Sequence, residues 1–74
     1  MDANERQKLR ARIRALDISL TVFARDADMK RSRVYGFFAT GQPELTPAEL
    51  RRGMAVLAQY EQFRQIVGVG VGAA

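Results

Sequence analysis

Residues 20–41 of the 74-residue chain read LTVFARDADMKRSRVYGFFATG, and the apolar positions in this stretch decide the fold. Phe23 and Ala27 are four residues apart, so they share one face of a helix. Val34 and Phe37 are three residues apart and share one face of a second helix. A short polar break separates the two pairs. The spacing therefore predicts two short helices that pack on one small core.

The residues around the break predict how these two helices meet. Ala24 is small at the position where the helices would cross, and the apolar side chain of Met29 can plug the turn. We therefore expect helices over residues 20–27 and 31–39.

A first helix is predicted over residues 4–16. Asp2 suits its N-cap, and Glu5, three residues later, completes a capping box. Three apolar residues form one stripe at helical spacing: Leu9, Ile13 and Leu16. Ser19 is then in position to cap the helix that follows.

A last helix is predicted over residues 47–65. Thr46 can cap it, Pro47 suits the first helical position, and Glu49 completes a second capping box. Its apolar residues form two seams about 90° apart. The first seam, assigned to the intramolecular core, consists of Leu50, Met54 and Leu57. The second seam, assigned to a homodimer interface, consists of Val56, Tyr60, Phe63 and Val67.

The homodimer assignment follows from the length of the second seam, which extends beyond what three short helices can cover. The alternative is a monomer in which this seam folds back on the first helix. Residues 67–74 alternate Val with Gly, and three glycines weaken any strand. We expect a single domain over residues 1–66 and a flexible C-terminal tail over residues 67–74.

The pattern resembles the Cro/CI-type (XRE-like) helix-turn-helix repressors of phages, plasmids and restriction-modification systems. The resemblance covers about a third of the chain and rests on Phe23, Ala24, Ala27, Asp28, Met29, Val34 and Phe37, and more weakly on Thr40 and Gly41. The family usually has Gly at the turn position, where this chain has Asp28. The resemblance therefore implies a left-handed backbone conformation at Asp28, which Asp tolerates less easily than Gly. The resemblance implies an all-α fold, a lambda-repressor-like bundle of four or five helices with a central helix-turn-helix over residues 20–41.

Composition and charge favour a polyanionic partner. The formal net charge is +4, and residues 1–40 hold nine of the twelve cationic residues against five acidic ones. The absence of Cys and His excludes disulfides, thiolate catalysis and the usual zinc sites. Asp26 and Asp28 lie among cations and indicate local charge balance rather than a paired-carboxylate site. We therefore expect no enzyme activity, cofactor or metal, and no small-molecule ligand is evident.

The sequence also predicts that the protein does not enter a membrane. No segment approaches the ~20 apolar residues of a membrane span. The charged N-terminus lacks the apolar region of a signal peptide. We expect a cytoplasmic protein.

The start of helix 31–39 is where this motif meets base edges. The residues expected to read bases are Lys30, Arg31, Ser32, Tyr35 and Gly36. Arg31 can bind guanine through two hydrogen bonds. Gly36 either lets the backbone approach DNA closely or is simply tolerated.

Phosphate contacts are expected around this reading surface and at the N-terminus of the preceding helix. The residues expected to make them are Ser19, Thr21, Arg25, Arg33, Thr40 and Gln42. Arg10 and Arg14, on the first helix, are either solvated side chains or further DNA contacts.

These features predict a small homodimeric transcriptional regulator, specifically a repressor, that binds an inverted repeat in double-stranded DNA. Helix 31–39 would lie in the major groove. The alternative is a protein-binding adaptor, an antiactivator or antirepressor, that keeps the scaffold but presents an apolar surface to another regulator. The cations at the start of helix 31–39 favour DNA.

Overall fold

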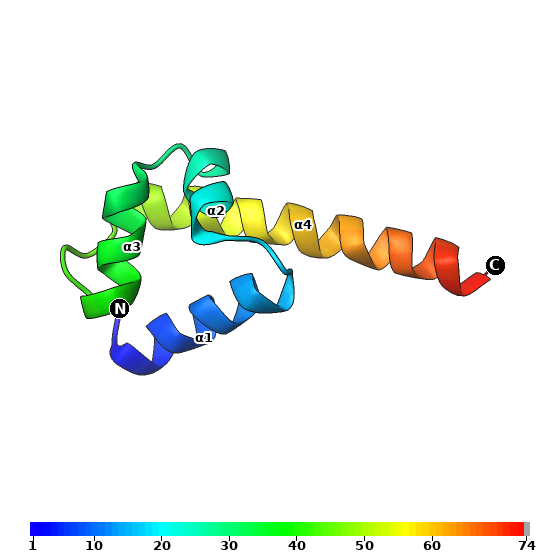
Figure 1. The fold of residues 1–74 in the computed structure, drawn as a ribbon, viewed down its shortest axis with the longest axis horizontal. Helices are drawn as coiled ribbons and strands as arrows, with labels where there is room; N and C mark the ends of the chain where they lie inside the picture. Colours follow the sequence, from blue (N-terminus) through cyan, green and yellow to red (C-terminus); the bar gives the residue numbers. More distant parts are fainter. Residues whose placement is uncertain (74) are drawn as a thin grey trace.

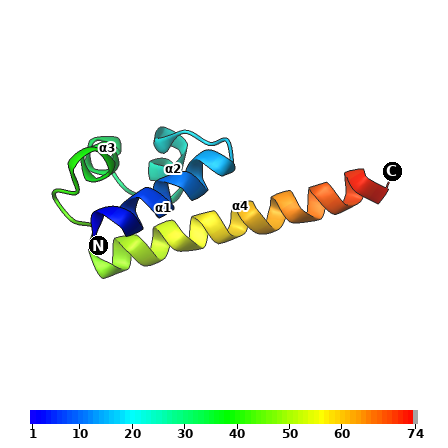
Figure 2. The same cartoon turned by 90° about the horizontal axis from the view of Figure 1, so that it is seen from below.

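The computed structural model describes the backbone of residues 1–73 and the side chains of residues 1–65. This part of the chain forms four helices and no strand: α1 (Ala3–Ala15), α2 (Leu20–Asp26), α3 (Arg31–Thr40) and α4 (Pro47–Ala73). The first three helices gather along the N-terminal half of α4, and the rest of α4 extends away from them (Figure 1). Figure 2, turned by 90°, shows α4 on one side of the molecule and α2 and α3 on the other. The expected all-α class is confirmed.

The helices begin where their predicted capping residues lie. The side chains of Asp2 and Ser19 accept backbone N–H bonds at the starts of α1 and α2. At the start of α4, the Thr46 backbone N–H donates to the Glu49 carboxylate at 2.8 Å, and the Glu49 N–H donates to the Thr46 hydroxyl at 3.1 Å. The second predicted capping box is reciprocal, whereas the first has only the bond from the Glu5 N–H to the Asp2 carboxylate within the described part of the chain.

The turn between α2 and α3 has the predicted left-handed residue. Asp28 has φ of 57°, and the N–H of Met29 donates to the carbonyl of Ala24 at 2.8 Å, which closes the turn. Asp17, after α1, has φ of 59°, which the sequence analysis did not anticipate. Aspartate occurs at positive φ more often than most residues, and both loops turn at an aspartate in this conformation. Gly41 ends α3 in a left-handed conformation with φ of 81°.

One core joins the helices. Its buried residues are Leu9, Ile13, Leu20, Phe23, Ala24, Ala27, Val34, Phe37, Val56 and Leu57. The half-buried ring of Phe38 packs edge-on against Phe37 at 5.1 Å and against Phe23 at 6.3 Å between ring centroids. The two helices of residues 20–41 therefore share the core that their apolar spacing predicts.

The face that α4 turns to this core agrees with the prediction at Leu57, which is buried, but differs from it at two other positions. Val56, expected in a homodimer interface, is buried in the core and only 7% exposed, whereas Met54, expected in the core, is 41% exposed. The reason is Gly53, where an added Cβ would lie 2.8 Å from Cζ of Phe23. The large Phe23 ring fits against α4 only where a side chain is missing. This contact rotates α4 so that Gly53, Val56 and Leu57 face inward.

Two arginine contacts hold α4 against α1. Arg12 donates to both carboxylate oxygens of Glu61, at 2.6 and 3.1 Å, and Arg64 donates to the carbonyl of Ala15. The latter carbonyl lies in the last turn of α1, which leaves it without an intrahelical partner. Glu61 and Arg64 therefore tie the second half of α4 to the helix that precedes α2.

The helix α4 is longer than predicted. It continues to Ala73, so the expected helix end near residue 65 is wrong, and α4 crosses the boundary expected between residues 1–66 and the tail 67–74. No proline follows Pro47, and each residue added to an existing helix gains a backbone hydrogen bond. Within the described residues, no helix is both long enough and apolar enough to cross a membrane.

Candidate nucleic-acid interface

The start of α3 presents polar side chains to solvent. Lys30, Arg31 and Ser32 are all exposed, and none of them hydrogen-bonds to or pairs with another side chain in the part of the chain that the structure describes. Lys30 occupies the N-cap position with an extended backbone, and its side chain does not cap the helix. The first amides of α3 and the Arg31 guanidinium are therefore available to an external partner.

Tyr35 connects this surface to the start of α2. Its hydroxyl lies 3.2 Å from the Thr21 hydroxyl, and the ring is 45% exposed. Together with Arg31 and Ser32, Tyr35 lines a shallow hollow. The predicted base-reading residues at the start of α3 and the predicted phosphate contact Thr21 therefore belong to one continuous surface.

Ser19 lies beside this surface at the N-terminus of α2. Its hydroxyl accepts from the N–H of Val22 at 3.1 Å, so it is used as a cap. Arg25 is at the opposite end of α2, where it contacts Asp26 at 3.3 Å and remains 73% exposed. Of these two predicted phosphate residues, only Arg25 therefore has a long side chain that extends into solvent.

Arg33 does not extend from this surface. Its Nε and Nη2 donate to the two Glu49 oxygens at 2.5 and 2.6 Å, and Nη2 also donates to the Glu44 carbonyl at 3.1 Å. The Arg33 bond and the Thr46 backbone bond lower the pKa of Glu49 to about 2. Arg33, predicted as a phosphate contact, therefore joins α3 to α4.

Gly36, Thr40 and Gln42 form a closed group at the end of α3. The Thr40 hydroxyl donates to the Gly36 carbonyl at 3.1 Å and accepts from the Gln42 N–H at 3.2 Å. A Cβ on Gly36 would lie 3.6 Å from the Gln42 carbonyl oxygen. Gly36 is therefore half-buried beside the loop before α4.

Arg52 is a residue that the sequence analysis missed. Its Nε donates to the Ala27 carbonyl at 2.9 Å, and Nη2 lies 3.4 Å from the Asp28 carbonyl. These carbonyls are at the C-terminal end of α2, where a cation is favourable. Arg52 thus fixes the turn that orients the start of α3. Its partners are 25 and 24 residues away, so no local pattern marks it.

A second surface lies where α4 passes the end of α2. Tyr60 donates to Asp26 at 2.5 Å, a bond that lowers the pKa of Asp26 and raises the pKa of Tyr60. These two residues line a hollow with Val56, Gln59 and Phe63. Phe63 is 67% exposed, which makes it the most accessible of the three seam residues whose side chains the structure describes. The side chain of Val67 lies outside the described residues.

No match to the chain is found among protein-family models, curated proteins or solved structures. Among the described residues, no three His, Cys, Asp or Glu side chains gather in a way that could hold a metal ion.

Proposed function

We propose that the protein is a sequence-specific DNA-binding transcriptional regulator that inserts the start of α3 into the major groove, in the manner of lambda-repressor-like helix-turn-helix proteins. The observation that carries the proposal is Arg31 at the first position of α3, which is exposed and has no side-chain partner among the described residues, beside exposed Lys30 and Ser32. In helix-turn-helix proteins, this end of the second helix contacts base edges.

The residues next to Arg31 supply the other contacts. Arg31 reads guanine, which contributes about 1–3 kcal/mol of discrimination. Ser32 and Tyr35 line the same hollow and contact the neighbouring base or sugar. Lys30, Thr21 and the amides at the start of α2 bind phosphates, which orient the protein on the duplex without reading its sequence.

The test compares Arg31→Gln with Arg51→Gln. Arg51 is exposed on α4, so its loss removes the same charge away from the proposed interface. Sequences selected from a random duplex pool by the wild-type protein provide the probe. We expect Arg31→Gln to weaken binding about 10-fold to 100-fold and to lose preference at one base position. Equal affinity of Arg31→Gln and Arg51→Gln would overturn the assignment of Arg31.

We propose further that the protein binds an inverted repeat as a homodimer through the Tyr60 and Phe63 side of α4. The exposure of Phe63 and the adjoining hollow support this surface. Burial of an exposed aromatic side chain is a common source of association energy. Two copies related by two-fold symmetry would present their α3 helices to half-sites about 34 Å apart.

The dimer is tested by the mass in solution. Phe63→Ser removes the exposed ring, and Met54→Ser is the control because Met54 is exposed outside the hollow beside Tyr60. Sedimentation equilibrium is expected to show a dimer for the wild type and for Met54→Ser, and a weaker dimer for Phe63→Ser. A wild-type monomer at all concentrations would exclude the dimer.

The adaptor hypothesis draws support from the same exposed Phe63. Binding to duplex DNA at low salt discriminates the two functions, because phosphate contacts are strongest there. A wild-type protein that binds no duplex at low salt would favour the adaptor.

A further inference from the structure

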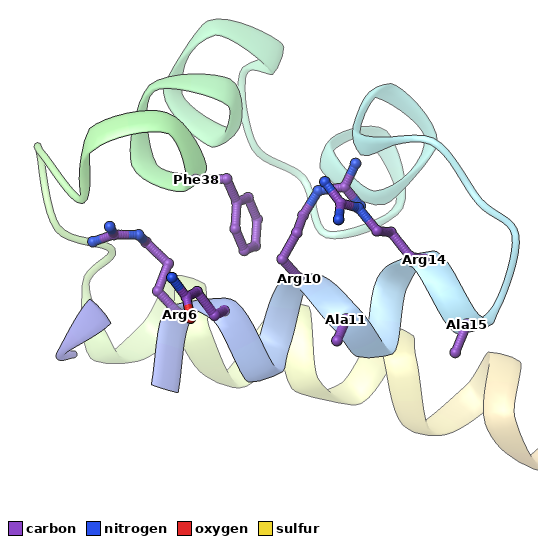
Figure 3. A pocket seen from close by; sticks show the side chains of 7 residues that line it. Arg6, Arg10, Ala11, Arg14, Ala15 and Phe38 are labelled. Atoms are coloured by element: carbon purple, nitrogen blue, oxygen red, sulfur yellow. The ribbon is translucent and has the colours of Figure 1, made fainter. Parts of the chain in front are cut away.

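Three arginines of α1 line one open cavity. Arg6, Arg10 and Arg14 are four residues apart along α1, so they occupy the same side of the helix on successive turns. Figure 3 shows their side chains entering the space between α1 and the helices α2 and α3. The cavity measures about 740 Å³, and Phe38 of α3 also lines it.

These arginines lack the partners that other arginines of the chain have. Arg12 pairs with Glu61 and Arg33 pairs with Glu49, whereas Arg6, Arg10 and Arg14 make no ion pair within the described residues. Nη1 of Arg10 is shielded from water and has no hydrogen-bond partner there. Buried donors in folded proteins are nearly always satisfied, so this unsatisfied donor indicates that an acceptor is missing beside Arg10.

The electrostatics of the cavity also favour an anion. Burial lowers the pKa of Arg10, and the neighbouring charge of Arg14 lowers it further. Like charges four residues apart destabilise a helix. An anion between these two guanidinium groups would remove both unfavourable effects. In Figure 3 the Arg10 and Arg14 side chains converge, in agreement with the effect of the Arg14 charge on the pKa of Arg10, while Arg6 lies on the other side of the Phe38 ring.

The cavity adjoins the proposed DNA surface. Tyr35, whose hydroxyl contacts Thr21 at the start of α2, lies close enough to Arg10 to raise its pKa. At the other end, the Arg6 guanidinium lies against the backbone of Gly41, since a Cβ on Gly41 would be 2.2 Å from its Nη1. The arginines thus extend about 12 Å along α1 from the end of α3 towards the start of α2.

We propose that the cavity between α1 and α3 binds phosphate groups, one between Arg10 and Arg14 and a second at Arg6. The guanidinium group presents parallel N–H donors that match two oxygens of a phosphate. In its DNA form the inference rests on the proposed function: the phosphates are those of the strand that passes the start of α2. A free phosphate compound offers the same chemistry.

The first experiment measures how the affinity for duplex DNA depends on salt. The variant is Arg10→Gln with Arg14→Gln, and the control is Lys8→Gln with Arg51→Gln, which removes equal charge. Lys8 lies on α1 beside Met54, outside the arginine cavity. The slope of log K against log [KCl] is expected to become shallower by about 1 in the variant, since the one lost phosphate contact contributes about 0.9. The control slope is expected to equal that of the wild type.

The second experiment uses inorganic pyrophosphate without DNA. Pyrophosphate should raise the Tm of the wild type and of the control variant, Lys8→Gln with Arg51→Gln, above the Tm measured in NaCl of equal ionic strength. It should not raise the Tm of Arg10→Gln with Arg14→Gln. Far-UV circular dichroism checks folding, and Arg14→Gln alone replaces the double variant if the latter does not fold.

The two experiments separate the possible outcomes. A shallower slope in the Arg10 and Arg14 variant alone identifies DNA phosphates as the ligand. Equal slopes combined with a selective Tm increase identify a free phosphate compound as the ligand. A wild type that binds no duplex at low salt but shows the selective Tm increase identifies the same ligand, and in that case the proposed function fails while the phosphate site stands. Equal slopes or no DNA binding, combined with no selective Tm increase, overturn the phosphate site.

Discussion

Arg33 and Glu49 form a two-pronged ion pair in which Nε and Nη2 lie 2.5 and 2.6 Å from the two carboxylate oxygens. Glu49 simultaneously accepts from the Thr46 backbone at 2.8 Å. One carboxylate therefore caps α4 and holds α3 against its first turn. With Arg33 used in this way, Arg31 and Lys30 are the cations that the start of α3 presents outward.

Glu49→Gln is expected to lower the free energy of unfolding at pH 7. The pKa of Glu49 is about 2 in the folded protein against an ordinary 4.5, so its charge stabilises the fold fully above about pH 4.5. This contribution is lost as the pH falls towards 2, where wild type and Glu49→Gln should become equally stable. Urea unfolding across this pH range checks the convergence. Glu44→Gln is the control, since Glu44 is 60% exposed and its loss should change little.

Gly53→Ala is expected to destabilise the protein. The added methyl group would lie 2.8 Å from Cζ of Phe23, whose ring is buried and 1% exposed. Overpacking costs about 1–3 kcal/mol, which exceeds the gain of about 1 kcal/mol that Ala brings to a helix. Urea unfolding measures the difference. Unchanged or increased stability would show that Phe23 moves aside.

Gly36→Ala is expected to have the opposite effect. Its methyl group would lie at ordinary contact, 3.6 Å from the Gln42 carbonyl oxygen, so the gain in helix propensity of up to about 1 kcal/mol is retained. DNA affinity should remain unchanged, because Gly36 faces the loop before α4. Thermal unfolding and a binding titration test the two parts. A large loss of affinity with normal stability would instead support a close approach of DNA at Gly36.

Tyr60→Phe is expected to raise the pKa of Asp26 towards its ordinary value. The Tyr60 hydroxyl is the largest cause of the lowered pKa, and Arg25 contributes less. An NMR titration of the Asp26 carboxyl carbon measures the change, and Arg25→Gln should give a smaller rise. Because a lowered pKa stabilises the fold above the ordinary value, the stabilities of wild type and Tyr60→Phe should converge as Asp26 becomes protonated. An unchanged pKa in Tyr60→Phe would mean that the bond does not form in solution.

The local parts of the structure followed from residues close together in the chain. Ser19 and Thr46 mark helix starts because their side chains bond to N–H groups three residues later. Asp28 marks the turn because it tolerates positive φ. The exposed positions of Arg31 and Ser32 follow from the helical period that buries Val34 and Phe37.

The parts that sequence reasoning missed depend on the orientation of α4. The partner of Arg33 is 16 residues away, and the partner of Tyr60 is 34 residues away. Both pairings depend on how Gly53 accepts the Phe23 ring, which hydrophobic spacing does not encode. The two seams of α4 lie about 90° apart and are equally apolar when α4 is considered alone. For this reason the spacing assigned Val56 to a partner chain and Met54 to the core.

The sequence by itself determined the helical class, the starts of the helices, the α2 turn and the residues at the outward end of α3. Hydrogen bonds within four residues and the helical period decide these features, so they need no knowledge of distant contacts. Only the tertiary structure decided which arginines are paired internally and which remain available. Arg33 meets Glu49, while Arg6, Arg10 and Arg14 face a cavity in which the structure supplies no carboxylate. The physical reason is that a long charged side chain takes its partner from whichever element packs beside it.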